Sequence, residues 1–392
     1  MDHTISTSFG KERQRTLYNG MHSSKSVRFP VSYEKWEEEA RRKLDDGPFY
    51  FVKGGAGSEE TVRANRKSFE RWAIVPRMLT DISERNLTIS IFGEKFNYPI
   101  MIAPIGAQTI LHPEGELATA QAAAKLGVPY IVSTVSSTSM EEIANAMGTA
   151  PRWFQLYWNE DPDITKSFIN RAEKAGYSAL VITLDANVTP WREQDLYNAF
   201  LPFLMGSGIE NYLTDPVFCE QLEEDPTKNK EAAMKHWSKV FGNPRITWKD
   251  IDWIRQQTNL PILLKGILHP DDAKLALKHG VDGIIVSNHG GRQINGSIAA
   301  LDALPKIADV IQDDIPVLMD SGIRRGSDVL KAMALGAKAV LVGRPYAYGL
   351  AVGGEKGVSE VLQNLIADVD LTLALSGRST ISEIDRSLLV KQ

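Results

Sequence analysis

One short string of the sequence places a titratable base beside an anion-binding group. Residues 287–292 read SNHGGR, so that two glycines separate His289 from Arg292. A histidine can take up a proton near neutral pH, and a guanidinium binds a carboxylate through paired hydrogen bonds. An isolated histidine is more often structural, but a histidine and an arginine at one strand end form an acid–base constellation. We therefore expect proton transfer on an anionic substrate at this turn.

Three other charged side chains are candidates for the same site: Lys265 and Asp185, which end apolar runs, and Arg192, seven residues beyond Asp185. Lys265 ends the run ILLK, where a buried cation is costly unless an anion or a developing negative charge lies nearby. It could form a Schiff base or stabilise a reduced, anionic flavin ring, and the lysine alone does not decide between these roles. Asp185 could orient the imidazole of His289, and Arg192 could add a second cation unless it is simply solvated.

Two glycine-rich loops near the end of the chain have the composition of a phosphate site. They are DSGIRRG at 320–326 and VGRP at 342–345, and each combines glycines with arginines before a helical segment. Exposed backbone N–H groups and a helix N-terminus favour a phosphate at such a position. The alternative is that the glycines only permit tight turns and the arginines pair with surface carboxylates. We expect a ligand that carries a phosphate.

A repeated pattern of strands and helices must position these residues. Short runs rich in valine and isoleucine recur from Pro99 onward, each followed by a segment of helical period, which is typical of parallel strands with crossover helices. The pattern predicts an α/β protein, a closed (β/α)8 TIM barrel, whose chemistry lies at the C-terminal strand ends. An open doubly wound sheet is the alternative, but the dinucleotide fingerprint G-x-G-x-x-G is missing. The eight expected strands are 99–104, 129–134, 152–157, 179–185, 261–266, 282–288, 315–320 and 337–343.

Two parts of the chain lie outside this repeat. Residues 1–30 are polar and are expected to form a flexible segment ahead of a single barrel domain at 31–392. The stretch 199–247 between the fourth and fifth strands is long for a barrel loop, and we interpret it as a lid over the site. The alternative is a solvated surface loop, which suits its charged portion better than its apolar start, FLPFLMGSGI.

Composition argues against several classes of function. The 392 residues include 44 basic and 49 acidic side chains, and the net charge of -5 provides no basic field for nucleic acid. The single cysteine, Cys219, cannot form an internal disulfide or a cysteine-based metal cage, and no metal site is expected. The sequence shows neither a signal-peptide pattern nor an apolar run of membrane-spanning length. We expect a cytoplasmic protein that binds neither nucleic acid nor membrane.

The string SNHGGRQ at 287–293 resembles the active-site signature of the FMN-dependent 2-hydroxy acid oxidases and dehydrogenases. Other blocks resemble that family in the same order: PIMIAPIGA, WFQLYWNED, VITLD followed by Trp191-Arg192, LPILLKG, MDSGIRRGSD and VGRPYA. The resemblance runs from about Pro30 to Ser387, and the stretch NAFLPFLMG…NYLTDPVF is most similar to the lactate 2-monooxygenase branch. It implies an FMN cofactor and oxidation of a small L-2-hydroxy acid at Cα, with O2 as the acceptor, in a homotetramer or homo-octamer.

The resemblance also implies a role for each residue at the barrel mouth. His289 would be the base, paired with Asp185, and Tyr157 would hydrogen-bond the reacting end of the substrate. Arg192 and Arg292 would bind the substrate carboxylate. The implied flavin-binding residues are Pro104, Gly106, Ser133, Gln155, Thr183, Lys265 and Ser287 around the ring, and Asp320, Gly322, Arg324, Gly343 and Arg344 around the ribityl chain and phosphate.

Two positions bear on the substrate and the product. Phe51 stands where relatives usually carry a tyrosine that binds the substrate carboxylate, which favours a more apolar pocket and leaves a bulky hydroxy acid or cyclic amino acid as the alternative substrate. Gly106 stands where relatives carry alanine or glycine, and a glycine there would leave the keto acid room to stay bound and be decarboxylated. Two readings from other classes also stay open: a lyase that uses Lys265 as a Schiff base, and a catalytically silent ligand-binding scaffold.

Overall fold

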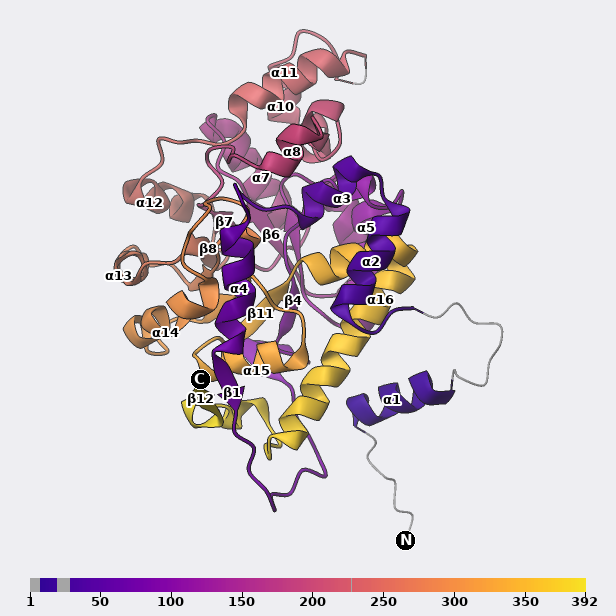
Figure 1. The fold of residues 1–392 in the computed structure, drawn as a ribbon. Coiled ribbons are helices and arrows are strands. Elements are labelled where there is room, and N and C mark those ends of the chain that lie inside the picture. Colours follow the sequence, from indigo (N-terminus) through magenta and orange to yellow (C-terminus); the bar gives the residue numbers. More distant parts are fainter. Residues whose placement is uncertain (1–7, 20–28, 227) are drawn as a thin grey trace.

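Eight parallel strands close into a barrel in the computed structural model, which describes residues 8–19, 29–226 and 228–392. The strand order around the barrel is β10-β11-β4-β5-β6-β7-β8-β9, and helices surround it (Figure 1). All eight predicted strands are therefore confirmed, and closure of the sheet contradicts the open doubly wound alternative. The strands are β4 Ile100–Ile102, β5 Tyr130–Ser133, β6 Arg152–Leu156, β7 Leu180–Thr183, β8 Ile262–Ile267, β9 Gly283–Val286, β10 Val317–Met319 and β11 Ala339–Val342. The crossover helices are α5 Gly115–Leu126, α6 Met140–Met147, α7 Pro162–Lys174, α12 Trp248–Gln257, α13 Pro270–Lys278, α14 Ala300–Ile311, α15 Gly326–Ala334 and α16 Arg344–Leu375.

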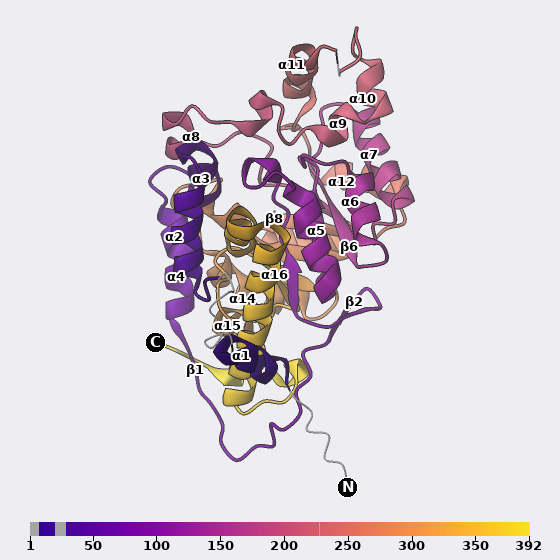
Figure 2. The same ribbon diagram turned by 90° about the vertical axis from the view of Figure 1, so that its right-hand side faces the viewer.

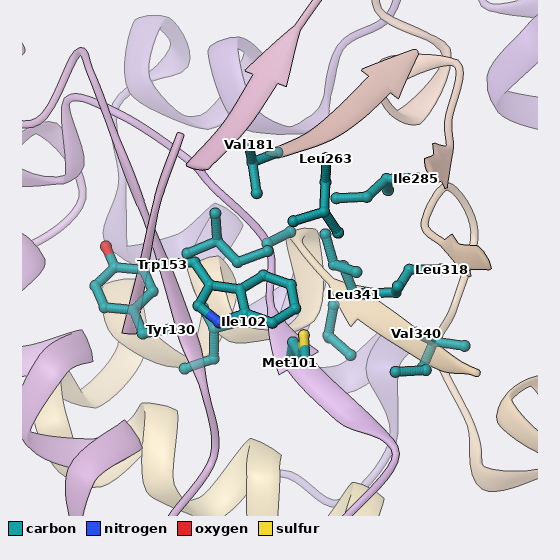
Figure 3. Close-up of a cluster of buried hydrophobic side chains, with 14 of the residues drawn as sticks. Met101, Ile102, Tyr130, Trp153, Val181, Leu263, Ile285, Leu318, Val340 and Leu341 are labelled. Carbon is teal, nitrogen blue, oxygen red and sulfur yellow. The ribbon is translucent and has the colours of Figure 1, made fainter. Parts of the chain in front are cut away.

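Apolar side chains fill the barrel, and polar side chains take over at its C-terminal end. Figure 3 shows the buried cluster, with Trp153 and Met101 among side chains from several strands. Helices cover the outer face of each strand, so both strand faces are buried and the strands read as continuous apolar runs. At the strand ends, Ser133 pairs in register with Gln155, and Thr183 pairs with Lys265. All four of these polar residues are buried, which marks this end of the barrel as the site.

The opposite end of the barrel is closed by a short hairpin, β2 (Ile89–Ile91) with β3 (Glu94–Phe96). Phe92 and Phe96 pack on Trp153; their ring centroids lie 5.8 and 6.2 Å, respectively, from the centroid of the Trp153 ring. Because Trp153 lies near the start of β6, the hairpin seals the end that is remote from the polar strand ends.

The N-terminal segment contains a helix that packs on α16, so the prediction of a flexible segment is wrong for residues 9–19 (Figure 2). Gly10 N donates to Asp370 Oδ2 at 2.8 Å, and Arg13 forms an ion pair with Glu360. The remainder of that prediction falls largely on residues 1–7 and 20–28, which lie outside the described residues.

No helix in the described part of the chain combines the length and apolarity needed to cross a membrane. The four helices before the barrel are α1 Phe9–Asn19, α2 Tyr33–Lys43, α3 Asp46–Lys53 and α4 Glu60–Glu70, and a small sheet pairs β1 Trp72–Ile74 with β12 Leu389–Lys391.

The first part of the insertion after β7 is folded and tied to the barrel, so the alternative of a solvated surface loop is wrong for that part. Asn211 is fully buried; its Nδ2 donates to Thr134 O and Ser136 Oγ, both at 2.9 Å, and its Oδ1 accepts from Met140 N at 2.8 Å. The charged portion is solvated, as that alternative expected, with Glu223, Glu224 and Lys228 exposed. Figure 1 shows the insertion at the end of the molecule beyond α3. The α8 helix, Glu193–Tyr197, immediately precedes the insertion. The helices within it are η3 Pro202–Met205, α9 Glu210–Leu213, α10 Pro216–Glu220 and α11 Lys230–Val240.

Candidate active site

A cavity of about 380 Å³ lies at the C-terminal strand ends, between the barrel, the α3 and α4 helices and the insertion. The predicted site residues that line it are Phe51, Pro104, Gly106, Tyr157, Arg192, Lys265, His289, Arg292, Asp320, Gly322, Arg324, Gly343 and Arg344. Those outside its lining are Ser133, Gln155, Thr183, Asp185 and Ser287. The structure thus brings together side chains that are up to 293 positions apart in the sequence.

His289 is oriented by Asp185. Its Nδ1 lies 2.9 Å from Asp185 Oδ1, so Nδ1–H donates to the carboxylate and Nε2 is left to accept a proton. Burial lowers the pKa of His289; the charge of Asp185 opposes this effect, while Lys265 adds to it. Burial alone would raise the pKa of Asp185, but His289 and Lys265 outweigh it and the pKa is lowered. The pair is therefore a neutral imidazole beside a carboxylate, which is the protonation state of a general base.

The turn that carries His289 holds an unusual backbone conformation. His289 has φ +58°, in the left-handed region that non-glycine residues seldom adopt, and Gly290 follows at +67°. Ser287 Oγ accepts the His289 N–H and Ser321 Oγ accepts the Gly290 N–H, each at 3.0 Å. These hydrogen bonds stabilise the strained turn and orient the imidazole toward the cavity.

Lys265 is a buried cation held by Ser287 and Asp320. Its Nζ donates to Ser287 Oγ at 3.0 Å and lies 3.4 Å from Asp320 Oδ2. Burial would lower the pKa of Lys265, but Asp320 and Asp185 outweigh it, so the pKa is raised. A Schiff base requires a neutral amine, so this environment contradicts the lyase reading. A permanent positive charge suits the stabilisation of negative charge on a bound ring.

Two buried polar atoms next to Lys265 are left without partners. Gln155 Nε2 and Thr183 Oγ1 have no hydrogen-bond partner among the described residues, although both side chains are buried. An unpaired buried polar group is costly, and such groups in a row on neighbouring strands fit a ligand with donors and acceptors along one edge. The pyrimidine edge of the FMN ring has that pattern. Gln155 Oε1 also accepts from Ser133 Oγ at 3.1 Å, which fixes the amide orientation.

The phosphate end of such a ligand fits the loop after β10 and the start of α16. Gly343 is the N-cap residue of α16, which begins at Arg344 and is kinked at Gly353 and Gly354, so the N-terminus of its first segment faces this region. Gly322 and Arg324 line the same part of the cavity wall, and the Arg324 guanidinium lies 3.9 Å from the ring centroid of Tyr33. The residues present therefore fit FMN.

The Arg344 side chain forms hydrogen bonds within the protein. Its guanidinium donates to the carbonyl oxygens of Val52 at 2.9 Å and of Gly54 and Gly290, both at 2.8 Å. These bonds join the end of α3 to the turn of His289. The Arg344 side chain is thus bonded to backbone carbonyls, and the predicted role of Arg344 at the ribityl chain and phosphate stays a prediction. Its backbone N–H, in the first turn of α16, is the group left for a phosphate.

Arg292 and Arg192 meet at the cavity, as predicted, but differ in their partners. Arg292 donates to the carbonyls of Phe51 and Gly54 and lies over the Phe51 ring, 5.1 Å from its centroid. Its guanidinium is within ion-pair distance of no carboxylate of the described residues. Arg192 Nη2 donates to Gln293 Oε1 at 2.8 Å. Asp195 pairs with Arg192 at 3.6 Å and also interacts with Arg292 from beyond ion-pair distance. Two guanidinium groups that share one carboxylate favour the binding of a further anion at Arg292.

Tyr157 lies at the cavity between the arginines and Lys265. Its backbone N–H donates to Thr134 Oγ1 at 3.0 Å, and its ring packs edge-on against Phe241 at 5.3 Å. Burial raises the pKa of Tyr157, with Lys265 opposing the effect. The phenol therefore stays protonated and can donate a hydrogen bond to a bound oxyanion or hydroxyl.

Gly106 lines the cavity, but its missing side chain would not point into open space. A Cβ at this residue would lie 2.2 Å from the carbonyl oxygen of Val135, which already accepts the Ala107 N–H at 2.8 Å. The expectation that Gly106 makes room at the flavin is therefore wrong. The glycine permits the close approach of two loops.

Sequence reasoning missed Asn65 and Ser321. Asn65 lies on α4, outside the strand and helix repeat, and pairs with Asn288; nothing in its local pattern distinguishes it from a surface amide. Ser321 directly follows Asp320 in the predicted phosphate loop, and its Oγ donates to Asp320 Oδ1 at 2.8 Å. The position of Ser321 in the predicted phosphate loop is the sequence feature from which its role could be predicted.

Comparisons with known proteins agree with this geometry. The family model described as FMN-dependent dehydrogenase matches residues 40–391. An L-lactate oxidase from Lysinibacillus sphaericus is 45% identical over 363 residues, which cover 93% of each chain. The 2-hydroxyacid oxidase 1 of Homo sapiens is 40% identical over 92% of this chain and 96% of its own. A solved structure of mandelate oxidase with (S)-4-hydroxymandelic acid superposes with a TM-score of 0.82 at 39% identity, covering 93% of this chain and 99% of that one.

The site geometry, the family model and the relatives agree, and the predicted FMN cofactor is confirmed. The chain belongs to the family of FMN-dependent 2-hydroxy acid oxidases and dehydrogenases.

Proposed function

We propose that this enzyme oxidises an L-2-hydroxy acid at Cα and passes the electrons to O2, giving the 2-keto acid and hydrogen peroxide. The observation that carries the proposal is that His289, oriented by the Asp185 carboxylate, and Arg292, which has no ion-pair partner among the described residues, line the same cavity. The names of the relatives, L-lactate oxidase and 2-hydroxyacid oxidase, support oxygen as the acceptor.

The roles of the substrate-binding residues follow from their positions. Arg292, with Arg192 beside it, binds the carboxylate, and Tyr157 donates to the substrate oxygen at Cα. His289 Nε2 takes the hydroxyl proton, and Asp185 stabilises the imidazolium that results. Proton removal at the hydroxyl makes the Cα hydrogen a better hydride donor.

The flavin-binding residues surround the place where the substrate Cα must lie. FMN accepts the hydride when it is bound. Lys265 would stabilise negative charge on the ring, and the unpartnered Gln155 Nε2 and Thr183 Oγ1 would hold the ring edge, with Ser133 bonded to the glutamine. Ser287 and Asp320 hold Lys265. Pro104 and Gly106 line the cavity and would border the ring, while Gly322, Arg324, Gly343 and the Arg344 N–H would hold the phosphate.

Anaerobic reduction tests the proposal. L-lactate, the smallest chiral substrate of the class, is mixed with the FMN-loaded enzyme without oxygen; loss of the yellow flavin absorbance is expected, and D-lactate should leave it unchanged. Admission of O2 should restore the colour with formation of peroxide. A flavin that no 2-hydroxy acid reduces would leave only a binding scaffold.

A second product outcome is favoured by the position of the insertion. Phe203, Trp237 and Phe241 of the insertion line the cavity, so a keto acid could be retained beneath them while peroxide forms. Peroxide attack on the retained pyruvate would give acetate, carbon dioxide and water, as in a lactate 2-monooxygenase. Peroxide released per O2 consumed distinguishes the cases: close to one indicates an oxidase, and close to zero with acetate indicates a monooxygenase.

We also propose a homotetramer or homo-octamer. Exposed apolar side chains cluster in the segment 188–205, which leads into the insertion. Clusters of exposed apolar side chains are typical of subunit interfaces. Light scattering on the purified protein gives the assembly mass directly, and a monomer would contradict the proposal. The exposed residues are Val188, Trp191, Leu196, Tyr197, Leu204 and Met205.

A further inference from the structure

Five aromatic side chains form a continuous wall on one side of the cavity, which we call the aromatic arc: Phe51, Phe203, Trp237, Phe241 and Tyr157. Phe203 lies at its centre, with ring centroids 6.2 Å from Phe51, 5.4 Å from Trp237 and 6.4 Å from Phe241. Phe241 in turn lies 5.3 Å from Tyr157. The arc thus runs from α3 across the insertion to the end of β6.

The backbone near Phe203 is built to admit its ring. Gly208 has φ +86°, and a Cβ there would lie 2.9 Å from Phe203 Cε1 and 2.9 Å from Val135 O. A glycine at 208 therefore lets the insertion fold back against the barrel and hold the Phe203 ring at the cavity. The position of this ring is set by packing and does not depend on a free loop conformation.

The four groups on the substrate Cα leave one direction open. In the proposed function the carboxylate would face Arg292, the hydroxyl would face His289, and the hydrogen would face the flavin side of the cavity; all three directions are marked by residues of the lining, the last by Lys265. The fourth group, the side chain of the hydroxy acid, then faces the aromatic arc. The Arg292 guanidinium covers the Phe51 end of the arc. Apart from the Tyr157 hydroxyl and the indole N–H of Trp237, the side chains of the arc from Phe203 onward offer hydrocarbon surface alone, and a charged side chain would lose its hydration there without compensation.

We propose that the enzyme prefers 2-hydroxy acids whose side chain is a branched alkyl group or an aromatic ring, and that Phe203 determines this preference. The inference rests on the proposed function and names its substrate class. Each buried methylene should raise kcat/KM by about fourfold, the factor expected for removal of one methylene from water. An aromatic side chain gains further from edge-to-face packing on the arc.

A substrate series tests the preference. kcat/KM is measured for L-lactate, L-2-hydroxybutanoate, L-2-hydroxy-4-methylpentanoate, L-3-phenyllactate and L-2-hydroxybutanedioate, whose side chain is charged. We expect at least a tenfold rise from lactate to the branched or aromatic acids, and the dicarboxylate should be the poorest substrate. If lactate is the best substrate, the inference fails and the proposed function stands. If no member of the series reduces the flavin, the proposed function fails as well.

Two variants assign the effect to Phe203. Phe203→Ala should lower the ratio of kcat/KM for phenyllactate over lactate by about tenfold, because the ring that packs on the substrate is lost. Phe200→Ala is the matched control: Phe200 also contacts Phe51, at 6.1 Å, but does not line the cavity, so the ratio should not change. An unchanged ratio in Phe203→Ala would overturn the assignment.

Phe203→Leu keeps the residue apolar and covers the case in which the alanine variant does not fold. Binding of phenylpyruvate and pyruvate to the oxidised holoenzyme is followed by the change in flavin absorbance. The preference for phenylpyruvate should fall by at least threefold in Phe203→Leu, because the leucine side chain cannot pack edge-to-face with the ligand ring. Equal preference in the variant and the parent enzyme would again overturn the role of Phe203.

Discussion

Asn65 and Asn288 exchange two hydrogen bonds across the gap between α4 and the turn of His289. Asn65 Nδ2 donates to Asn288 Oδ1 at 2.8 Å, and Asn288 Nδ2 donates to Asn65 Oδ1 at 2.7 Å. Asn288 Oδ1 also accepts the Gly291 N–H at 3.0 Å, so this side chain shapes the turn itself. A helix outside the barrel therefore helps to hold the base in its left-handed conformation.

Replacement of Asn65 tests this positioning role. Asn65→Leu should lower the free energy of unfolding by about 2 kcal/mol, because buried hydrogen-bonding groups lose their partners. It should also slow flavin reduction by roughly 10- to 100-fold with a smaller change in KM, since a misplaced base affects the chemical step. Asn198→Ala, which removes an amide bonded within the short helix α8, is the control and should leave both quantities unchanged. Lower stability with an unchanged reduction rate would mean that Asn65 is only structural.

The His289–Asp185 pair predicts the pH dependence of the reaction. The base must be neutral, so kcat/KM should fall as the pH drops through the pKa of His289, which lies below its ordinary value of about 6.5. His289→Gln should slow anaerobic flavin reduction by roughly two to four orders of magnitude while FMN stays bound. Asp185→Asn removes the charge that favours the imidazolium, so its acid limb should move to lower pH as the rate falls. An acid limb that moves upward in Asp185→Asn would contradict the pairing.

Arg344 and Arg324 are predicted to differ in their effect on the phosphate. Arg344 is bonded to Val52, Gly54 and Gly290 carbonyls, so Arg344→Met should loosen α3 and raise KM but leave the ratio of FMN to riboflavin affinity within about threefold. Arg324→Met should reduce that ratio by about tenfold or more, the loss expected for a charge-assisted hydrogen bond. Equilibrium titration of the apoprotein with both flavins measures the ratio. The reverse pattern would return the phosphate role to the Arg344 side chain.

Gly106 is predicted to be a packing residue. Gly106→Ala should reduce stability by about 1–3 kcal/mol, the range for overpacking, because the new methyl group meets the Val135 carbonyl. Thermal unfolding of the holoenzyme measures this loss, and the peroxide released per O2 should stay at the parent value in the enzyme that remains folded. Normal stability together with a rise in free peroxide would show instead that Gly106 controls retention of the product.

The barrel and most of its mouth could be predicted from the sequence because both depend on local pattern. Buried parallel strands appear in the sequence as apolar runs, and their C-terminal ends converge at one end of a barrel. The sequence therefore predicts that Gln155, Thr183 and Lys265 share one site. The prediction of FMN as the cofactor rests on the resemblance of a short string around His289 to a known family.

The features that the sequence does not predict concern residues whose environment is set by distant segments. The Arg344 guanidinium is satisfied by carbonyls of α3, nearly three hundred residues earlier, and Gly106 is fixed by the approach of Val135 from the next strand. The α1 helix is polar in sequence and gains its order from contact with α16. Composition carries no information on these partners, so tertiary packing overrides the local expectation.

Replacement of Phe51 is the most direct test of which side chains determine the substrate specificity of the pocket. Its ring lies under the Arg292 guanidinium and its carbonyl accepts from the same group, so a hydroxyl added to this ring remains within the wall that faces the carboxylate site. Phe51→Tyr should improve kcat/KM for L-lactate by about fivefold, equal to roughly 1 kcal/mol for one net hydrogen bond. L-3-phenyllactate should gain less, because the hydroxyl also brings a polar group into the aromatic arc. Phe51→Leu, which removes the ring without adding a donor, serves as the control and should not improve lactate. If Phe51→Tyr leaves lactate unchanged, the added hydroxyl does not reach the carboxylate, and the natural phenylalanine serves the apolar side chain of the substrate alone.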